Sequence, residues 1–449
     1  MKINKKISVF GGIILLFLFN NQLHAQQKMT LQECVNFALE HSFDVKQKIL
    51  EKESKYIQLN ATKTSIAPSV GANVGQNFNF GRASLPDNTT VNMNTAQTTT
   101  NFGVGVNMEI FQGLRTHHQI KSDKLTLEAT LFDIETAKEN IELLVTANYL
   151  QILLNKEMLE IYKTQVVLDK EQVNRVQILV NNGKSSDAEI YVAKSTMASD
   201  QLSVVEANNA LRLSLLELAQ LMNYPDVEHF DIVSESNISE IDEILNKNVD
   251  VTDVIGNALE NRPAIQAALT RIEQAKRSIK ISQSGWYPSL TLSANIGTAY
   301  YYSFKDIMEY PNERFGKQLN KNARETVGVS LNIPIFDKLS THYNVKQQKL
   351  NVKSQELQLE ETKRRLIKDI EQAYANAVAA KEKYAASQVA YTSTQIAFQY
   401  EEVKYNAGSS TNYEYNDAKN KYLKAQSNLA QAKFDYLFRI KILEFYGKY

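Results

Sequence analysis

An internal repeat with a constant offset of 225 residues constrains the fold of this 449-residue chain more than any other feature. Gly183 and Gly408 are separated by this offset, and so are Phe111 and Phe336. The other recurring residues are Gly103, Val104, Asn107, Ile110, Leu114, His117, Tyr149, Glu189, Ala193 and Lys194, with Gly328, Val329, Asn332, Ile335, Leu339, His342, Tyr374, Glu414, Ala418 and Lys419 as their counterparts. Two copies of one structural unit therefore follow each other, which suits a symmetric conduit better than an enzyme core.

Composition excludes several classes of protein. Lys and Arg together number 50, as do Asp and Glu, so no global charge points to nucleic acid as a partner. The mean hydropathy of −0.35 excludes a membrane protein built as a helical bundle. Glycine (16) and proline (7) are scarce, which favours long uninterrupted helices.

Residues 1–25 are interpreted as an export signal and are left out of the fold. Three lysines among the first six residues precede a mostly apolar run at 7–19, and Ala25 offers a small residue for cleavage. The run is short for a membrane span, although a retained anchor helix is the alternative reading.

Cys34 is the only cysteine, so an intrachain disulfide is impossible. It lies well past the cleavage site and cannot be the lipid-bearing first residue of a mature protein. We expect it to pack with Phe37 and Ala38 on the apolar side of a helix. After the signal no stretch has 18 apolar residues, so a location in a membrane would require β-strands.

The first half of the chain predicts a helix followed by a β-hairpin. Helical spacing of apolar residues at 30–66 ends at Pro68. Apolar residues then alternate with Gly and Asn at 70–80 and again at 102–110. A polar loop rich in Asn and Thr is expected at 81–100, between the two strands.

The second half repeats this hairpin, with alternation at 290–302 and 327–335 around a polar loop at 303–325. Alternation of apolar with small polar residues leaves two readings open. The apolar face is the core of a soluble sandwich, or it faces lipid while the polar face lines a lumen.

Aromatic residues at both ends of these strands favour the second reading. One group comprises Phe111, Phe336, Trp286 and Tyr287, and the other comprises Phe80, Tyr300, Tyr301, Tyr302 and Phe304. Two such belts suit the two interfaces of a bilayer. Four strands cannot close a barrel, so several chains are expected to contribute hairpins to one shared barrel.

Each hairpin is followed by a helix of unusual length, at 114–180 and 338–405, which would span about 100 Å. Apolar residues three and four apart predict coiled-coil-like packing of these helices. Stop signals follow at Asn181-Asn182-Gly183 and Asn406-Ala407-Gly408. Return helices at 187–221 and 412–446 would complete two helical hairpins.

These elements divide the chain after the signal into three segments. The first repeat covers 26–222 and the second covers 253–449, each with a helix, a β-hairpin and a long helical hairpin. Between them, 223–252 is acidic and irregular, and we interpret it as a small side element midway along the helical body.

No constellation of residues predicts catalysis, a cofactor or a metal centre. Gly183-Lys184-Ser185 resembles the end of a phosphate-binding loop, but Ile178 stands where that motif needs glycine, and a helix precedes it instead of a strand. His117-His118 has no acidic partner at ligand spacing. We therefore expect no enzymatic activity.

Glu414 and Asp417 follow the second hairpin turn and share one helical face, because they are three residues apart. The first repeat keeps Glu189 but has Val192 in place of Asp417. Two readings remain open. The carboxylates belong to a solvated first turn favoured by the helix dipole, or they form a ring at the mouth of a tube made by several chains and select cations.

Several segments resemble the TolC family of outer-membrane efflux channels. They are Gly285-Trp286-Tyr287-Pro288-Ser289-Leu290, Ile333-Pro334-Ile335-Phe336-Asp337, and the hairpin tip from Tyr405-Asn406-Ala407-Gly408 to Tyr415-Asn416-Asp417-Ala418. Thr30-Leu31 through Ala38-Leu39 is similar to the opening helix of that family. The resemblance covers nearly the whole mature chain.

The resemblance implies a membrane α+β fold and a homotrimer in the outer membrane of a Gram-negative bacterium. Each chain would supply four strands to a twelve-stranded barrel, and its helices would form a coiled-coil tunnel in the periplasm. The tips, near 181–186 and 406–411, would bind a periplasmic adaptor protein joined to an inner-membrane pump. Glu414 and Asp417 match two acidic positions that constrict the tunnel entrance in the family.

We therefore expect a passive conduit that exports cargo from the periplasm while a partner pump supplies the energy. One alternative is a secretion channel for proteins or peptides, similar to type I systems. Another is an exported coiled-coil scaffold without a pore. The sequence names neither the cargo nor the adaptor and pump.

Overall fold

The computed structural model describes residues 28–84, 90–233, 250–304 and 312–448. The expected signal at 1–25 and most of the irregular element at 223–252 lie outside these ranges. The chain divides into two compact units. One comprises Met1–Lys48, Ile134–Arg262 and Arg364–Tyr449, and is called the hairpin unit below; the other comprises Ile49–Asp133 and Pro263–Lys363, and is called the sheet unit.

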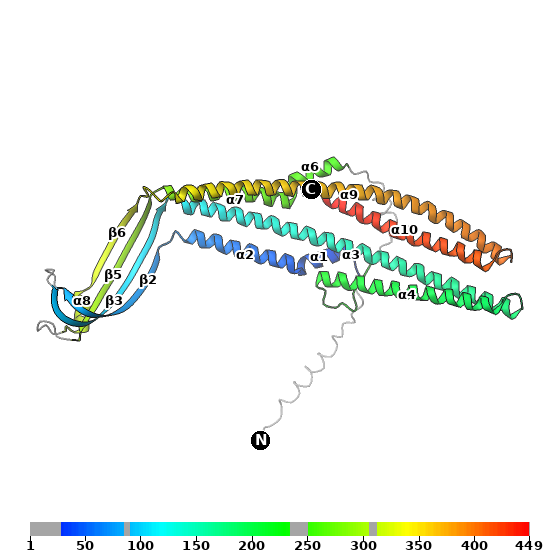
Figure 1. Ribbon diagram of the computed structural model, residues 1–449, viewed down its shortest axis with the longest axis horizontal. Coiled ribbons are helices and arrows are strands. Elements are labelled where there is room, and N and C mark those ends of the chain that lie inside the picture. Colours follow the sequence, from blue (N-terminus) through cyan, green and yellow to red (C-terminus); the bar gives the residue numbers. More distant parts are fainter. Residues whose placement is uncertain (1–27, 85–89, 234–249, 305–311, 449) are drawn as a thin grey trace, which may run out of the picture. The chain divides into compact units, whose positions relative to one another are not determined.

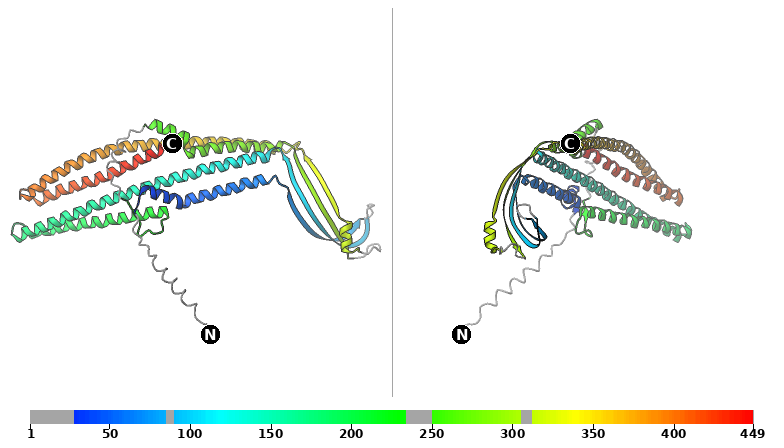
Figure 2. Two further views of the ribbon diagram at one scale, coloured as in Figure 1. Left: turned by 180° about the vertical axis from the view of Figure 1, so that it is seen from behind. Right: turned by 60° about the vertical axis from the view of Figure 1, so that its left-hand side comes forward.

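The sheet unit holds four antiparallel strands in the order β2-β3-β5-β6. Their bounds are β2 Ser69–Ser84, β3 Thr90–Gln112, β5 Ser289–Ser303 and β6 Arg324–Asn332. The central pair, β3 and β5, joins the two sequence repeats through hydrogen bonds. Figure 2 shows that the sheet is strongly curved.

The strand register sorts side chains onto two chemically different faces. In one cross-strand row Val70, Val106, Ala294 and Val327 lie opposite one another; in the adjacent row the residues are Gly71, Gly105, Asn295 and Thr326. Because alternate residues point to opposite faces, one face is apolar and the other carries small and polar side chains. The apolar face is uncovered in the single chain, since Val70 is 69% exposed and Val327 76% exposed.

The strands and loops differ from the prediction in length. The prediction of a polar loop over 81–100 is wrong in its bounds, because β2 continues to Ser84 and β3 starts at Thr90. Cross-strand pairing holds this Asn- and Thr-rich sequence extended, in spite of its loop-like composition. The last strand ends at Asn332 instead of 335, since Pro334 cannot donate a ladder hydrogen bond.

The loop expected at 303–325 contains a short helix, α8 (Phe315–Lys321), which the sequence analysis missed. Residues in and beside α8 cover the stretch of β5 that extends beyond its pairing with β6. The amide side chains of Asn322, Gln318 and Asn312 bind backbone groups of Ala299, Tyr301 and Ser303, respectively. These contacts satisfy alternate backbone groups of a strand edge that would otherwise be open to another chain.

The long helices have the predicted extents. Helix α3 spans Arg115–Asn181 and α9 spans Ser340–Asn406, each followed by an antiparallel return helix, α4 (Asp187–Met222) or α10 (Asn412–Tyr446) (Figure 1). The prediction of one continuous opening helix at 30–66 is wrong, because the helix is interrupted at Ser42. Ser42 has extended backbone angles, so the segment forms α1 (Leu31–His41) and α2 (Phe43–Thr64).

The remaining described elements are short. In the hairpin unit, β1 (Lys28–Met29) pairs in parallel with β4 (Asp231–Ile232), and α6 spans Val251–Asn261. In the sheet unit, α7 (Pro263–Gln283) leads through a 3-10 turn, η2 (Ser284–Trp286), into β5. None of the described helices combines the length and the apolar character needed to cross a membrane.

The main core of the hairpin unit surrounds Cys34, which is fully buried beside Ala38, Tyr149 and Leu218. Phe37 packs against the same cluster. The prediction that Cys34 packs on the apolar side of a helix is therefore confirmed.

The two helical hairpins have chemically different interiors. Aromatic residues seven apart face each other between α9 and α10, with ring centroids 4.8–6.3 Å apart for successive contacts. They are Tyr384, Tyr391, Phe398 and Tyr405 on α9, and Tyr415, Tyr422 and Tyr436 on α10. Near the tip of the other hairpin the core is aliphatic, with Val176, Ile190 and Ala193 buried together. The spacing of seven is that of a coiled-coil seam.

Candidate functional site at the hairpin tips

Both helical hairpins turn through the same backbone motif. Gly183 and Gly408 have φ angles of +66° and +74°, in the left-handed region that glycine adopts without steric cost. The amide of Lys184 donates to the carbonyl of Leu179 at 2.8 Å, and the amide of Ser409 donates to that of Lys404 at 3.0 Å. These six-residue closures are Schellman motifs, which satisfy the last carbonyls of α3 and α9.

The residues expected at the tips therefore lie at the turns. Asn181 and Asn406 end α3 and α9. Asn182 and Gly183 follow the first of these helices, and Ala407 and Gly408 follow the second.

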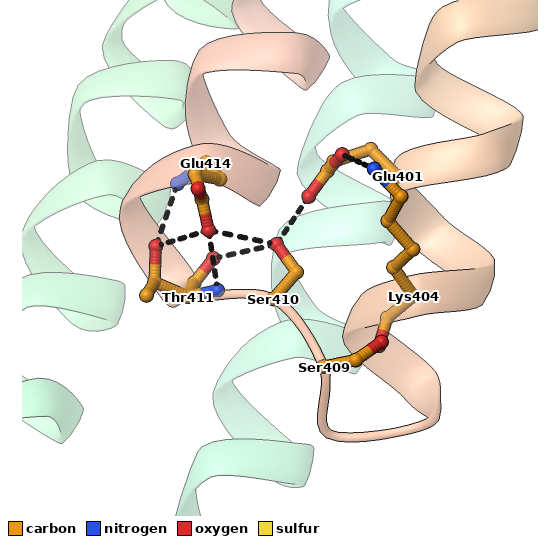
Figure 3. A network of polar contacts seen from close by, with 6 residues as sticks. All are labelled: Glu401, Lys404, Ser409, Ser410, Thr411 and Glu414. Atoms are coloured by element: carbon orange, nitrogen blue, oxygen red, sulfur yellow. Dashed lines mark hydrogen bonds and ion pairs between the residues drawn. The ribbon is translucent and has the colours of Figure 1, made fainter.

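Glu414 is bound into the first turn of α10. Its Oε2 accepts hydrogen bonds from the backbone N–H of Thr411 at 2.9 Å and from the Thr411 hydroxyl at 2.8 Å. The Thr411 Oγ1 in turn accepts from the backbone N–H of Glu414 at 3.2 Å. This reciprocal arrangement is a capping box, which pairs two backbone donors left free at a helix start (Figure 3).

Ser410 connects this cap to the preceding helix. Its hydroxyl donates to Glu401 on α9 and lies 3.2 Å from Oε2 of Glu414 (Figure 3). Glu401 also pairs with Lys404 at 3.4 Å. The turn between α9 and α10 is thus held by side chains from both helices.

Glu414 and Asp417 are both exposed, but each already has a partner. The backbone hydrogen bond from Thr411 is the largest cause that lowers the pKa of Glu414 below its ordinary value, followed by the hydroxyls of Thr411 and Ser410. Asp417 pairs with Lys421, one turn later, at 2.6 Å and raises the pKa of that ammonium. These hydrogen bonds therefore favour the ionised form of Glu414, while Lys421 locally balances the charge of Asp417.

The first repeat lacks this capping box. Ser186 precedes α4 without a side-chain cap, and Glu189 instead accepts from the hydroxyl of Ser185 at 2.8 Å. The role of Glu414 as a capping residue had a signal in the sequence, namely the spacing Thr411-x-x-Glu414 before a helix. The prediction of an acidic entrance ring did not include this capping role.

A charge cluster that comprises Lys419, Asp169 and Asp200 was also missed. Lys419 and Asp169 are buried, whereas the side chain of Asp200 is 25% exposed. Lys419 on α10 is only 1% exposed, and its Nζ bonds to Asp169 on α3 and lies 4.0 Å from Asp200 on α4. Burial raises the pKa of the Asp169 carboxyl to about 6, helped by the nearby Asp200 and opposed by Lys419. Within the described ranges no three His, Cys, Asp or Glu side chains are grouped to hold a metal ion.

The sequence carried a weak signal for this lysine. Lys419 is four residues after Tyr415 and three before Tyr422, so it lies on the same helical face as two residues of the aromatic seam. A charged residue at such a position indicates a buried partner.

A second polar contact joins the hairpins closer to the turns. Gln172 on α3 donates through Nε2 to the hydroxyl of Tyr405 at 2.7 Å and to Oδ1 of Asn412 at 3.0 Å. The guanidinium of Arg175 lies 5.6 Å from the centre of the Tyr405 ring. Side chains from α3, α9 and α10 thus meet at this point.

The aromatic residues expected at the membrane interfaces lie at the two ends of the sheet. Phe111 is opposite Leu290 at one end of the β3–β5 ladder, where Trp286, Tyr287 and Phe336 also flank the strands. At the other end, Tyr300 and Tyr302 lie opposite Thr100 and Thr98. Trp286 is 50% exposed and Phe336 is 76% exposed, so these rings are open to surroundings outside the chain.

The sequence model of a family described as outer membrane efflux protein matches residues 34–224 and 254–439. A toxin and drug export protein A from Aggregatibacter actinomycetemcomitans is 21% identical over 311 residues, which are 69% of this chain and 64% of that protein. The chain therefore spans slightly less than two thirds of the length of this relative.

Solved structures of outer-membrane proteins share the fold. The Campylobacter jejuni CmeC outer membrane channel aligns with a TM-score of 0.77 and 18% identity, over 93% of this chain and 85% of that chain. The outer membrane protein VceC from Vibrio cholerae aligns with a TM-score of 0.74 and 15% identity, over 93% and 96%. The open state of the Neisseria gonorrhoeae MtrE outer membrane channel aligns with a TM-score of 0.71 and 18% identity, over 93% of this chain and 88% of that chain.

Proposed function

Because this chain belongs to the outer membrane efflux protein family, we propose that it is the outer-membrane conduit of a tripartite export system. Cargo would pass from the periplasm to the exterior without chemistry in the channel, and an inner-membrane pump would supply the energy. The observation that carries this proposal is the uncovered apolar face of the sheet, backed by a face of small and polar residues. Such a sheet suits lipid on one side and a wet lumen on the other.

The assembly is a homotrimer in the outer membrane of a Gram-negative bacterium, with the helices in the periplasm. Strands β2 and β6 form the edges of the sheet within the chain, and pairing of these edges between three copies would give twelve strands. The aromatic residues at the two ends of the sheet lie at the two lipid interfaces, where amphipathic rings are favoured.

The hairpin turns at 181–186 and 406–411 bind a periplasmic adaptor protein that is joined to the pump. The Schellman turns support this role, because they present short rigid loops at the ends of long helices. Glu414 and Asp417 of three chains contribute an acidic ring near the tunnel entrance. The capping hydrogen bonds from Thr411 lower the pKa of Glu414 and so favour its ionised form.

The test is the conductance of purified, detergent-extracted protein in a planar bilayer, with and without a trivalent cation on the side of the hairpin tips. A small cation-selective conductance that the cation blocks is expected. The double variant Glu414→Gln with Asp417→Asn should lose the block, while Glu189→Gln should keep it. Conductance with an unchanged block in the double variant would reject the ring, and a lack of insertion would reject the channel.

A second candidate cargo is a toxin, because the relative from Aggregatibacter actinomycetemcomitans is named toxin and drug export protein A. Secretion of a protein through the same conduit would differ only in the pump and the adaptor. Deletion of the gene, followed by comparison of the secreted proteins and of sensitivity to small toxic compounds, separates the two cargoes. A mature protein that is soluble without detergent would instead favour a scaffold without a pore.

A further inference from the structure

A hollow of about 680 Å³ lies on the polar face of the sheet, at the start of β6. The described residues that line it include two cations, Lys321 and Arg324, and no aspartate or glutamate. Four asparagines also line it, namely Asn73, Asn101, Asn295 and Asn322. The hollow thus combines two positive charges with neutral groups that can donate hydrogen bonds, a chemistry that suits an anion.

Glycines beside Arg324 keep the floor of the hollow open. Arg324 on β6 is opposite Gly297 on β5, and Gly297 is in turn opposite Gly103 on β3. A Cβ at Gly103 would lie 2.7 Å from Oδ1 of Asn73, so the amide of Asn73 lies directly over this glycine. The row of Arg324 therefore has no side chain on β5 or β3, and room for a ligand remains above these strands.

The two cations of the hollow differ in how they are held. Lys321 ends α8, and Asn322 directly after it donates through Nδ2 to the carbonyl of Ala299 at 2.7 Å, which fixes this end of α8 on β5. Nζ of Lys321 lies 3.4 Å from Glu313, so that carboxylate offsets part of its charge. Arg324 is exposed, and no carboxylate in the described part of the chain pairs with it. Its guanidinium therefore supplies the unbalanced charge of the hollow.

The two acidic residues of the four strands, Glu325 and Glu109, do not neutralise this charge. Glu325 follows Arg324 directly, and successive residues of a strand point to opposite faces. By register Glu325 lies opposite Ile296, a residue of the apolar face. Glu109 belongs to the polar face, but it is six residues along β3 from Gly103, about 20 Å at the usual rise of a strand. Salt at physiological strength screens charges over about 8 Å, so Glu109 is too distant to matter.

From this hollow we propose that Arg324 and Lys321 form a subsite for an anionic group, a carboxylate or a phosphate, of molecules that pass through the barrel. The inference rests on the proposed function, which makes the polar face of the sheet the wall of the lumen. A guanidinium binds either group through two parallel hydrogen bonds, and the ammonium adds a second positive charge. A lipid headgroup would contact the opposite, apolar face, so cargo is the source that we assign. The barrel and the acidic ring would thus recognise groups of opposite charge.

The test measures binding of inorganic pyrophosphate and of citrate to the detergent-purified protein by equilibrium dialysis at low salt. At least one of these probes should bind to the wild type, with an affinity that falls as salt is added. Arg324→Gln should weaken this binding by about tenfold or more, the usual effect of losing hydrogen bonds between charged groups. Arg324→Lys should weaken it less, because lysine keeps the charge but not the planar fork. Undiminished binding to Arg324→Gln would overturn the proposal.

Two lysines of α8 provide a matched comparison that does not depend on whether the Arg324 variants fold. Lys317 lies one turn before Lys321 and is likewise 3.4 Å from Glu313, but it does not line the hollow. Lys321→Gln should therefore weaken binding of the probe, whereas Lys317→Gln should leave it unchanged. Equal effects of these two substitutions would overturn the subsite, because binding would then follow the net charge of α8 alone.

The conductance of the same preparation in a planar bilayer separates failure of the subsite from failure of the proposed function. A wild type that forms pores but binds neither probe contradicts the subsite and leaves the conduit in place. A wild type that forms no pores contradicts the proposed function itself, whatever it binds. Pores together with binding that depends on Arg324 and Lys321 would support both.

Discussion

Thr411 and Glu414 cap each other at the start of α10, each side chain accepting a hydrogen bond from the other's backbone N–H. The residue expected to supply charge to a tunnel entrance is therefore also part of the helix start. Its two contributions can be separated, because the cap needs only an acceptor oxygen and the ring needs a negative charge.

Thr411→Ala and Glu414→Gln are expected to affect two different properties, the stability of the first turn of α10 and the acidic charge at the tip. Thr411→Ala should lower the local stability of the first turn of α10 by about 1 kcal/mol, the usual cost of losing an N-cap, with the acidic charge retained. Glu414→Gln should preserve the turn, because glutamine also serves at this position of a capping box. Hydrogen exchange of the amides of the first turn, read by mass spectrometry, measures the first effect, and block by a trivalent cation measures the second. Faster exchange in Glu414→Gln than in Thr411→Ala would contradict this separation.

The contribution of Asp169 to the free energy of unfolding is expected to become less favourable as pH rises. Burial raises the pKa of its carboxyl from 3.8 to about 6, with Asp200 acting in the same direction and Lys419 against it. The folded state then holds a proton that the unfolded chain releases, so the destabilising contribution is absent below pH 3.8 and complete above about 6.

The measurement for Asp169 is the midpoint of thermal unfolding in detergent at pH 5 and pH 7.5, for the wild type and for Asp169→Asn. Relative to the variant, the wild type should gain stability at the lower pH. The same pH dependence in both proteins would show that Asp169 does not titrate in this window.

Phe398→Ala is expected to loosen the tip of the α9–α10 hairpin. The Phe398 ring stacks on Tyr422, with centroids 5.5 Å apart and planes 7° apart, and lies 5.6 Å from Tyr415. Removing a buried phenylalanine side chain costs about 3–5 kcal/mol. Hydrogen exchange should quicken in 398–422, whereas Val173→Ala, at the repeat-equivalent position, should affect α3 and α4 instead. Unchanged protection in Phe398→Ala would mean that the aromatic seam does not hold this hairpin together.

Gly113→Ala is expected to disrupt the sheet unit, and Gly183→Ala is its matched control. Both glycines have positive φ, but an added Cβ at Gly113 would lie 2.6 Å from the carbonyl oxygen of Ser284 and 2.7 Å from Cβ of Tyr287. At Gly183 no atom lies within 4 Å, so only the backbone cost of about 1–2 kcal/mol applies. The yield of folded, detergent-extracted protein should fall sharply for Gly113→Ala alone. Equal yields of the two variants would show that the backbone before α3 moves to accommodate the added Cβ without loss of folding.

The long helices and their ends were predictable because their signals are local. The stop at Asn406-Ala407-Gly408 and the start of α10 at Asn412 depend on residues within one or two turns of each other. The alternation of apolar and polar residues along the strands was equally predictable. Val104 and Val106 lie on the same face because residues two apart in a strand point in the same direction. The family resemblance rested on such local segments and is confirmed by the family match.

Three other features were not predicted from the sequence, each for a physical reason. Asn- and Thr-rich residues near 94–100 looked like a loop, and pairing with β2 and β5 made them strand. Helix α8 was missed because its position depends on hydrogen bonds to the backbone of β5 from Gln318 within it and Asn322 directly after it, and no local sequence pattern predicts such contacts. The break at Ser42 was missed because serine tolerates both helical and extended backbone.

The duplication was visible in the sequence as matching residues at a constant offset of 225. The periods of the helices and strands and the turns at Gly183 and Gly408 were visible as well, because they depend on residues close together in the chain. The pairing of β3 with β5 and the burial of Lys419 beside Asp169, 250 positions away, became visible in the folded chain alone. Such contacts depend on the free energy of packing whole helices and strands, to which residues far apart contribute jointly. The local pattern around Lys419 gave only a weak signal of burial and could not identify Asp169 and Asp200 as its partners.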